Sequence, residues 1–102
     1  MEEFDIIVDS RTEIGSSSSR KLKREGRVPG VLYQGRKSLP IEMEEDELRH
    51  ILAGKAEQNL VLNVSFNNKR FRAKIKEVQR EPVGGEIRHI DLMPLETDGY
   101  IH

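Results

Sequence analysis

The fold is decided by the stretch Leu60-Val61-Leu62-Asn63-Val64-Ser65-Phe66-Asn67-Asn68-Lys69-Arg70-Phe71-Arg72-Ala73-Lys74-Ile75-Lys76. On both sides of the Asn67-Asn68 pair, apolar residues recur at every second position, which is the period of a β-strand with one buried face. Asparagine tolerates the left-handed backbone that a two-residue hairpin turn requires. The stretch therefore predicts two antiparallel strands, with Phe71, Ala73 and Ile75 on the buried face of the second.

The same period marks four further strands, and two segments have the spacing of short helices. In one of these helices, Leu48, Ile51 and Leu52 fall on one side, behind an acidic first turn. The alternation slips at Val78, which predicts a β-bulge. We therefore predict a mostly β fold with two or three short helices, a small six-stranded antiparallel β-barrel whose closure protects its sheet edges. The further strands are expected at 4–8, 30–33, 39–43 and 87–92, and the helices at 17–25 and 44–53.

The length and composition limit what the chain can be. Its 102 residues suit a single domain, 1–102, with one modest core. Cysteine is absent and histidine occurs three times, which excludes disulfides and leaves few ligands for a metal. The acidic N-terminus lacks the order of a signal peptide, and no apolar run approaches the roughly 20 residues that span a bilayer. We expect a cytoplasmic protein without cofactor, metal or membrane contact.

The charge is unevenly distributed along the chain. The net charge is −1, but residues 20–37 contain seven basic side chains and one acid, a net charge of +6 that leaves −7 for the rest. Charges more than roughly 10 Å apart are screened at physiological salt, so the local field decides whether a polyanion is attracted. The segment 20–37 is therefore a candidate site for nucleic acid.

Within this segment, Ser19-Arg20-Lys21-Leu22-Lys23-Arg24 combines a predicted helix with clustered positive charge. The serines that precede Arg20 can cap the free N–H groups of its first turn. Leu22 is its single apolar residue, so the helix must be stabilised by docking or by a partner. A solvated basic surface is the ordinary alternative. Repulsion between Arg20, Lys23 and Arg24 on one side of the helix favours phosphate binding instead.

Strand residues supply further candidates. The basic residues of segment 70–76 form a second row, for which a solvent-facing role that opposes edge pairing is favoured over binding. His89 and Asp91 project from one side of a strand; alone they favour a structural role, whereas beside RNA the aspartate could accept from guanine or cytosine N–H groups. Tyr33 fits either the core or an interface. Neither a nucleophile with its pocket nor a glycine-rich phosphate loop is present in the sequence pattern, so we do not expect an enzyme.

Four blocks stand in the order and spacing of a known family. They are Ser19-Arg20-Lys21-Leu22-Lys23-Arg24, Arg27-Val28-Pro29-Gly30-Val31-Leu32-Tyr33, Val78-Gln79-Arg80-Glu81-Pro82 and His89-Ile90-Asp91-Leu92. Each block alone is a weak signal, but four in register are specific and extend over nearly the whole chain. The chain resembles the bacterial large-subunit ribosomal protein L-twenty-five family.

The resemblance implies a barrel similar to the anticodon-binding domain of glutaminyl-tRNA synthetase. It also implies a structural protein that binds the loop E region of 5S rRNA in the central protuberance of the large ribosomal subunit. Such a protein is cytoplasmic and ribosome-associated, is monomeric off the ribosome and takes no small-molecule substrate. In length the chain matches the short form of the family, or the N-terminal domain of the general stress protein CTC type. The rRNA-binding positions that carry over are Arg11, Arg20, Lys21, Lys23, Arg24, Tyr33, Gln79, His89 and Asp91.

Ser16, Gln34 and Leu92 depart from residues frequent in the family, and Lys21 and Lys23 stand where arginines are common. Lysine keeps the charge but not the bidentate fork, so these residues are expected to position the RNA more than to specify it. We expect the helix and Arg11 to contact phosphates and groove. The strand residues at 79, 89 and 91 are expected to contact base edges and 2′-hydroxyl groups.

Two other classes of protein are left open. In one, the acidic segment 42–47 docks a basic protein partner, and the complex would survive treatment with nuclease. In the other, His89 and Asp91 serve a small hydrolase, which requires a substrate pocket next to them.

Overall fold

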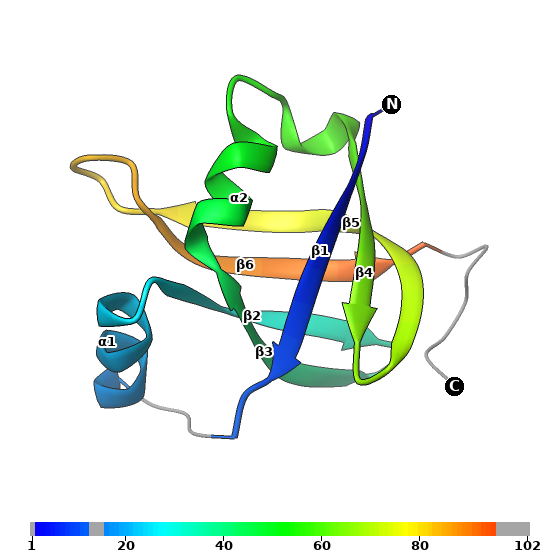
Figure 1. Ribbon diagram of the computed structural model, residues 1–102, viewed down its shortest axis with the longest axis horizontal. Coiled ribbons are helices and arrows are strands. Elements are labelled where there is room, and N and C mark those ends of the chain that lie inside the picture. Colours follow the sequence, from blue (N-terminus) through cyan, green and yellow to red (C-terminus); the bar gives the residue numbers. More distant parts are fainter. Residues whose placement is uncertain (1, 13–15, 96–102) are drawn as a thin grey trace.

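The computed structural model describes residues 2–12 and 16–95, with the backbone alone at 16–19. Figure 1 shows a barrel of strands with a helix beside one end and another against its wall. The mostly β fold with short helices is thereby confirmed. In chain order the elements are β1 (Glu2–Ser10), α1 (Ser16–Arg24), β2 (Arg27–Gln34), β3 (Lys37–Glu44), α2 (Glu45–Leu52), the 3-10 helix η1 (Glu57–Asn59), β4 (Leu60–Phe66), β5 (Lys69–Arg80) and β6 (Ile87–Pro94).

The pairing of the strands corrects one expectation. The barrel closes in the order β1-β3-β2-β6-β5-β4. Four of its interfaces are antiparallel, but β1 pairs with β4, and β2 with β6, in parallel. Parallel neighbours cannot be joined by a hairpin turn, and the period of a single strand carries no information about the direction of its neighbour. The antiparallel prediction is therefore wrong at two of the six interfaces.

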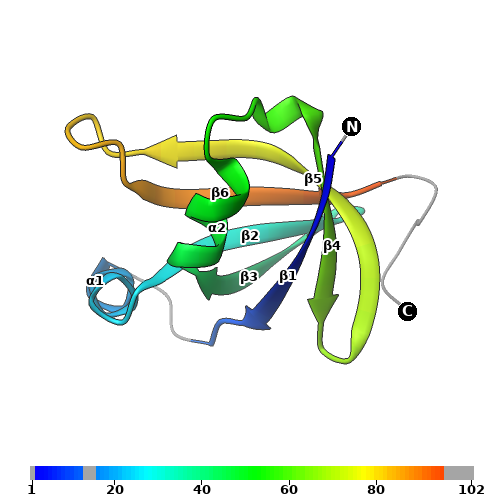
Figure 2. The same ribbon diagram turned by 45° about the horizontal axis from the view of Figure 1, so that its top comes forward.

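The predicted hairpin and core are confirmed. Asn67 and Asn68 both have positive φ, 49° and 64°, as a two-residue turn between right-twisted strands requires. Alternate side chains of the strands fill the barrel, and the apolar side of α2 packs into the same core. Figure 2 shows α2 lying against the barrel wall. The α2 side chains in the core are Leu48, Ile51 and Leu52.

A first β-bulge lies in β5, close to the predicted position. Ile75 lies opposite Leu92, but the next paired residue, Glu77, lies opposite Asp91, so Lys76 is an extra residue. The bulge shifts the alternation of β5 by one position. Val78 is therefore packed against the core instead of facing solvent.

A second bulge, in β6, was not predicted. Arg80 lies opposite Ile87 while Gln79 lies opposite His89, so Arg88 is the extra residue. Strict alternation from the buried Ile90 would turn residue 88 towards the core. The bulge instead buries Ile87, which is 1% exposed, and turns Arg88 outward.

The seam between β1 and β3 is the shortest strand interface of the barrel, with two paired positions. Arg27, at the start of β2, reaches across it. Its Nη2 donates to Asp9 Oδ2 of β1 at 2.6 Å, and its Nε donates to Glu42 Oε1 of β3 at 2.9 Å. Its Nη1 donates to Glu44 Oε1 at 2.8 Å. One guanidinium therefore connects three strands where the backbone pairing is weakest.

The pKa of Arg27 reflects this setting. Burial lowers the pKa of the guanidinium, but the hydrogen bond to Asp9 and the charges of Glu42 and Asp9 raise it by more, so that it lies above the ordinary arginine value. Stability that comes from a raised pKa is present below the ordinary pKa and is lost only as the pH rises past it. The charged guanidinium therefore contributes across the neutral range, and its contribution is lost in strongly alkaline solution.

We expect Arg27→Met to lower the free energy of unfolding by about 1–2 kcal/mol, because three gathered carboxylates lose their shared cation. Urea unfolding followed by circular dichroism measures the change. Arg49→Met is the matched control, since Arg49 makes an exposed pair with Asp46 within α2 and should matter by less than about 0.5 kcal/mol. Equal losses in the two variants would show that Arg27 is an ordinary surface cation.

Candidate nucleic-acid interface

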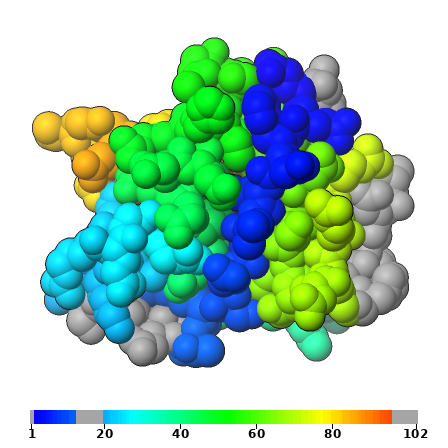
Figure 3. All heavy atoms as spheres, in the orientation of Figure 1, coloured from blue at the N-terminus to red at the C-terminus, as the bar shows by residue number. Residues whose placement is uncertain are grey.

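α1 lies at one edge of the molecule, next to residues of α2 (Figure 3). Leu22 is buried, and the Nζ of Lys23 donates to the backbone oxygen of Ile87 at 2.9 Å. The same ammonium lies 3.4 Å from a carboxylate oxygen of Glu86 and 3.9 Å from one of Glu45. Of the two expected sources of stability for this helix, docking and a partner, the structure shows docking on the barrel. The serine side chains that we expected to cap it lie outside the described residues.

Beside α1, the outer surface of the barrel is hollowed. This α1 hollow has a volume of about 400 Å³ and collects side chains from α1, β2, β5, β6 and the loop after β1. Four arginine or lysine side chains and one acid line it among the residues described, so its field attracts anions. The lining residues are Arg11, Arg20, Lys23, Pro29, Gln79, Glu81, Arg88 and His89.

The strands that form one wall of the α1 hollow contribute the amide of Gln79 and the imidazole of His89. Gln79 of β5 lies opposite His89 of β6 on the outer face. Two residues along β6, Asp91 is 7% exposed, and its Oδ1 lies 3.2 Å from the Nδ1 of His89. Within the described part of the chain this buried oxygen makes no hydrogen bond of regular geometry. The carboxylate therefore keeps acceptor capacity next to the imidazole ring.

Five of the nine predicted positions thus line one hollow, and Asp91 lies directly behind one of them. Lys21 lines a second hollow, which borders the end of β1 and also includes Arg11. Arg24 is exposed on α1 and lines neither of these two hollows. The structure therefore distributes the basic residues of α1 over more than one side of the helix.

Tyr33 lies farther along β2. It is four residues beyond Pro29, which corresponds to roughly 13 Å along a strand. The Nζ of Lys76, the extra residue of the β5 bulge, lies 4.2 Å from the centroid of its ring. This is a cation–π contact on the outer face of the barrel. Tyr33 therefore lies on the outer surface and not in the core, separate from the α1 hollow.

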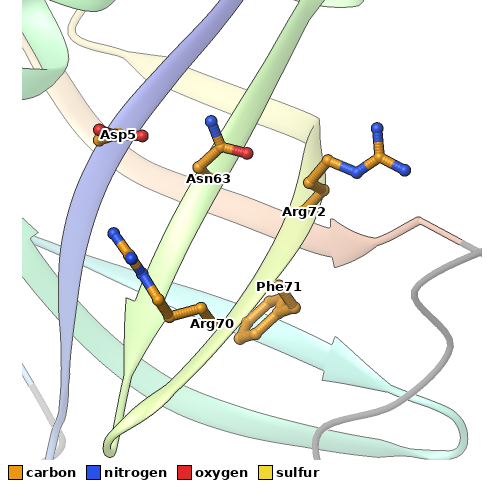
Figure 4. Close-up of a pocket in the computed structure, with 5 residues that line it drawn as sticks. All are labelled: Asp5, Asn63, Arg70, Phe71 and Arg72. Carbon is orange, nitrogen blue, oxygen red and sulfur yellow. The ribbon is translucent and has the colours of Figure 1, made fainter.

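The basic residues of segment 70–76 lie in different places: Lys76 is over Tyr33, whereas Arg70 and Arg72 line another hollow. Figure 4 shows Arg70 and Arg72 extending from β5 around a hollow that also includes Asp5 and Asn63 of the neighbouring strands. Both arginines are exposed, as a solvent-facing row requires. They lie on the outer face of β1, β4 and β5, whereas Gln79 and His89 lie on that of β5 and β6.

Two charged residues in the α1 hollow, Glu81 and Arg88, were not predicted from the sequence as site residues. Glu81 was part of a recognised block but was assigned no role. Arg88 was also assigned no role, and strict alternation along β6 would put it on the side of Ile90. A bulge leaves no mark at the position itself, so only the register between β5 and β6 could have revealed Arg88.

The acidic-segment alternative gains little from the structure. The α1 hollow does lie next to His89, as the hydrolase alternative requires, but no serine or threonine is among the described residues that line it. Glu42 and Glu44, from the acidic segment, are already hydrogen-bonded to Arg27. In the two described stretches, 2–12 and 16–95, no group of three or more His, Asp or Glu side chains is placed to hold a metal ion. Neither α1 nor α2 is long and apolar enough to cross a membrane.

The positive hollow, with amide and imidazole groups on its wall, gives this small β-barrel a surface whose charge suits a polyanion. Comparison with known proteins then gives the family. The sequence model of the Ribosomal L25p family matches residues 6–92. The chain belongs to the Ribosomal L25p family.

Several curated relatives support this membership. The large ribosomal subunit protein bL25 of Moorella thermoacetica is 38% identical over 98 residues, which are 91% of this chain and 47% of that protein. The protein of the same name from Rickettsia typhi is 33% identical over 95 residues, which are 92% of this chain and 47% of the relative. The chain spans about half the length of the curated relatives that it matches.

We expect Lys23→Met to loosen α1, because the Ile87 carbonyl and Glu86 lose the ammonium that joins them to the helix. Amide hydrogen exchange at residues 20–24 should accelerate, and the free energy of unfolding should fall by about 0.5–1.5 kcal/mol. Arg24→Met, an exposed change on the same helix, should alter neither quantity appreciably. Similar exchange in both variants would contradict the docking role of Lys23.

Proposed function

We propose that the chain is a structural, non-catalytic protein of the large ribosomal subunit that binds the loop E region of 5S rRNA in the central protuberance. One observation carries the proposal: Arg11, Arg20, Gln79 and His89, from separate segments, line one positive hollow. Membership of the Ribosomal L25p family, with relatives named as large-subunit proteins, supports the assignment to the subunit. We include in the proposal a single domain, a cytoplasmic, ribosome-associated location and a monomer off the ribosome.

The exposed cations of α1 supply the attraction to RNA. Arg20, Lys21 and Arg24 are exposed, and they project from the helix over more than one side. Phosphate contacts from such residues position a protein on RNA without reading its sequence. Lys23 differs from them, since its ammonium is already held by Ile87 and Glu86. We assign Lys23 the role of holding α1 beside the strands.

The strand residues supply selectivity. An internal loop of non-canonical pairs reshapes the RNA grooves, so that side chains can reach base edges and 2′-hydroxyl groups. Gln79 offers an amide donor and acceptor at the wall of the α1 hollow. His89 has its Nδ1 close to Asp91, which leaves Nε2 as the ring nitrogen for the RNA.

Asp91 acts in two ways in this proposal. Its burial beside His89 fixes the orientation of the imidazole, and we assign the carboxylate the role of acceptor for an N–H group of a base at the outer face. Both groups are mounted on β6, so little conformational freedom is lost when RNA binds. Fixed groups discriminate between RNA shapes better than flexible ones do.

We expect Arg20→Ala to weaken binding to 5S rRNA and to flatten its salt dependence, because one phosphate contact is lost. Each lost contact should reduce the slope of log affinity against log salt by about 0.7–0.9. Gel-shift titrations at several salt concentrations measure this slope. Arg49→Ala, on exposed α2, is the control and should bind like the unchanged protein. An unchanged slope for Arg20→Ala would remove this residue from the interface.

We expect Asp91→Asn to reduce the preference for 5S rRNA over a loop E mutant that forms an ordinary duplex, by about 1–3 kcal/mol. The substitution keeps the shape but removes the charge beside His89. The salt dependence should stay the same, because no phosphate contact is lost. Glu77→Gln is the matched control, since Glu77 lies opposite Asp91 and is exposed. If Asp91→Asn leaves the preference unchanged, the selectivity does not come from Asp91.

A further inference from the structure

One arginine of the α1 hollow, Arg88, has no role in the RNA contacts proposed above. It lines this hollow together with Arg20 and His89. Its place on the outer surface is fixed by the β6 bulge, between the buried Ile87 and His89. The Arg88 side chain is 61% exposed, so much of it is open to a ligand. The β6 bulge therefore holds the exposed Arg88 side chain at the edge of the α1 hollow.

Glu81 is the acid that faces this arginine. The Nε of Arg88 lies 3.7 Å from the Oε1 of Glu81, which is beyond a good hydrogen-bond distance, and both side chains are more than one-third exposed. Exposed pairs of this kind are weak. The Glu81 backbone is fixed in turn, because its N–H donates to the Glu86 carbonyl at 2.8 Å. Glu81 is thus held at the hollow without binding Arg88 firmly.

Arg80 of β5, which lies opposite Ile87, has a different partner. The Nη2 of Arg80 donates to the Glu57 Oε1 of η1 at 3.3 Å, and Arg80 is not among the residues that line the α1 hollow. Arg88 is therefore the arginine through which this end of the β5–β6 hairpin contributes to the hollow.

We propose that Arg88 contacts an RNA phosphate and that Glu81 is a weak internal competitor, displaced when RNA binds. The inference rests on the proposed function. A phosphate offers Arg88 a bidentate, charge-assisted pair that the carboxylate at 3.7 Å does not. Arg20 from α1 and Arg88 from β6 then contact the backbone of the RNA, while Gln79 and His89 meet the groove between these contacts. Glu81 repels the same phosphates and sets an upper limit on affinity.

The test compares Arg88→Ala, Arg88→Lys and Glu81→Gln with Arg49→Ala as the control, using the full chain, 5S rRNA and gel-shift titration at several salt concentrations. Arg88→Ala should weaken binding roughly tenfold and reduce the salt slope by about 0.7–0.9. Arg88→Lys should recover part of the affinity, because the charge remains and the fork is lost. Glu81→Gln should tighten binding about threefold, because a repelling charge is removed.

The double variant Glu81→Gln/Arg88→Ala separates the two residues. If Glu81 acts partly by holding Arg88, the gain from Glu81→Gln should shrink when Arg88 is absent. Full affinity and slope in Arg88→Ala, alongside weakened binding by Arg20→Ala, would overturn the role of Arg88 and leave the proposed function standing. Failure of the unchanged protein to distinguish 5S rRNA from an unrelated duplex would overturn both. Equal thermal midpoints for all variants confirm that folding is unaffected.

Discussion

Closure of the barrel at the short β1–β3 seam is the constraint on which the rest of the structure depends. Two backbone pairs hold that seam, and Arg27 adds hydrogen bonds to Asp9, Glu42 and Glu44. The segment that supplies Arg11 and Arg20 runs from the end of β1 to the start of β2, and both ends are fixed by this one side chain. Arg27 therefore fixes the anchor points of the basic segment without lining the α1 hollow itself.

Irregularities in two strands determine what the outer face can bind. The bulge at Lys76 places an ammonium over Tyr33, and the bulge at Arg88 turns an arginine outward beside His89. Between them, the regular pairing of β5 with β6 keeps Gln79 and His89 side by side. A barrel with unbroken alternation would bury residue 88 and expose Ile87, and its outer face would lose a cation while gaining an apolar side chain. The charge and shape of the α1 hollow thus depend on the register of β5 with β6 as much as on the residues themselves.

The sequence predicted the strands, the Asn67-Asn68 hairpin and the side of α2 that packs into the core, because each of these depends on local period and on residues that tolerate positive φ. It did not predict the parallel pairs, which join residues far apart in the chain, or the Arg88 bulge, which depends on the register between β5 and β6. For the site, the charge run and the family blocks marked residues that share one hollow. They did not show that Lys23 is engaged by the Ile87 carbonyl or that Asp91 is buried, since both facts arise from packing between elements.

The parallel pairing of β1 with β4 also has a consequence for how the chain acquires its shape. Residues 2–8 are synthesised well before their parallel partners, residues 60–66. At about 5–20 residues per second, the first strand waits on the order of 3–12 s before its neighbour exists. Contacts between such distant segments also form slowly, because a large loop must close first. During that interval β1 can pair only with β3, at two positions, so barrel closure is a late step in the folding of each new chain.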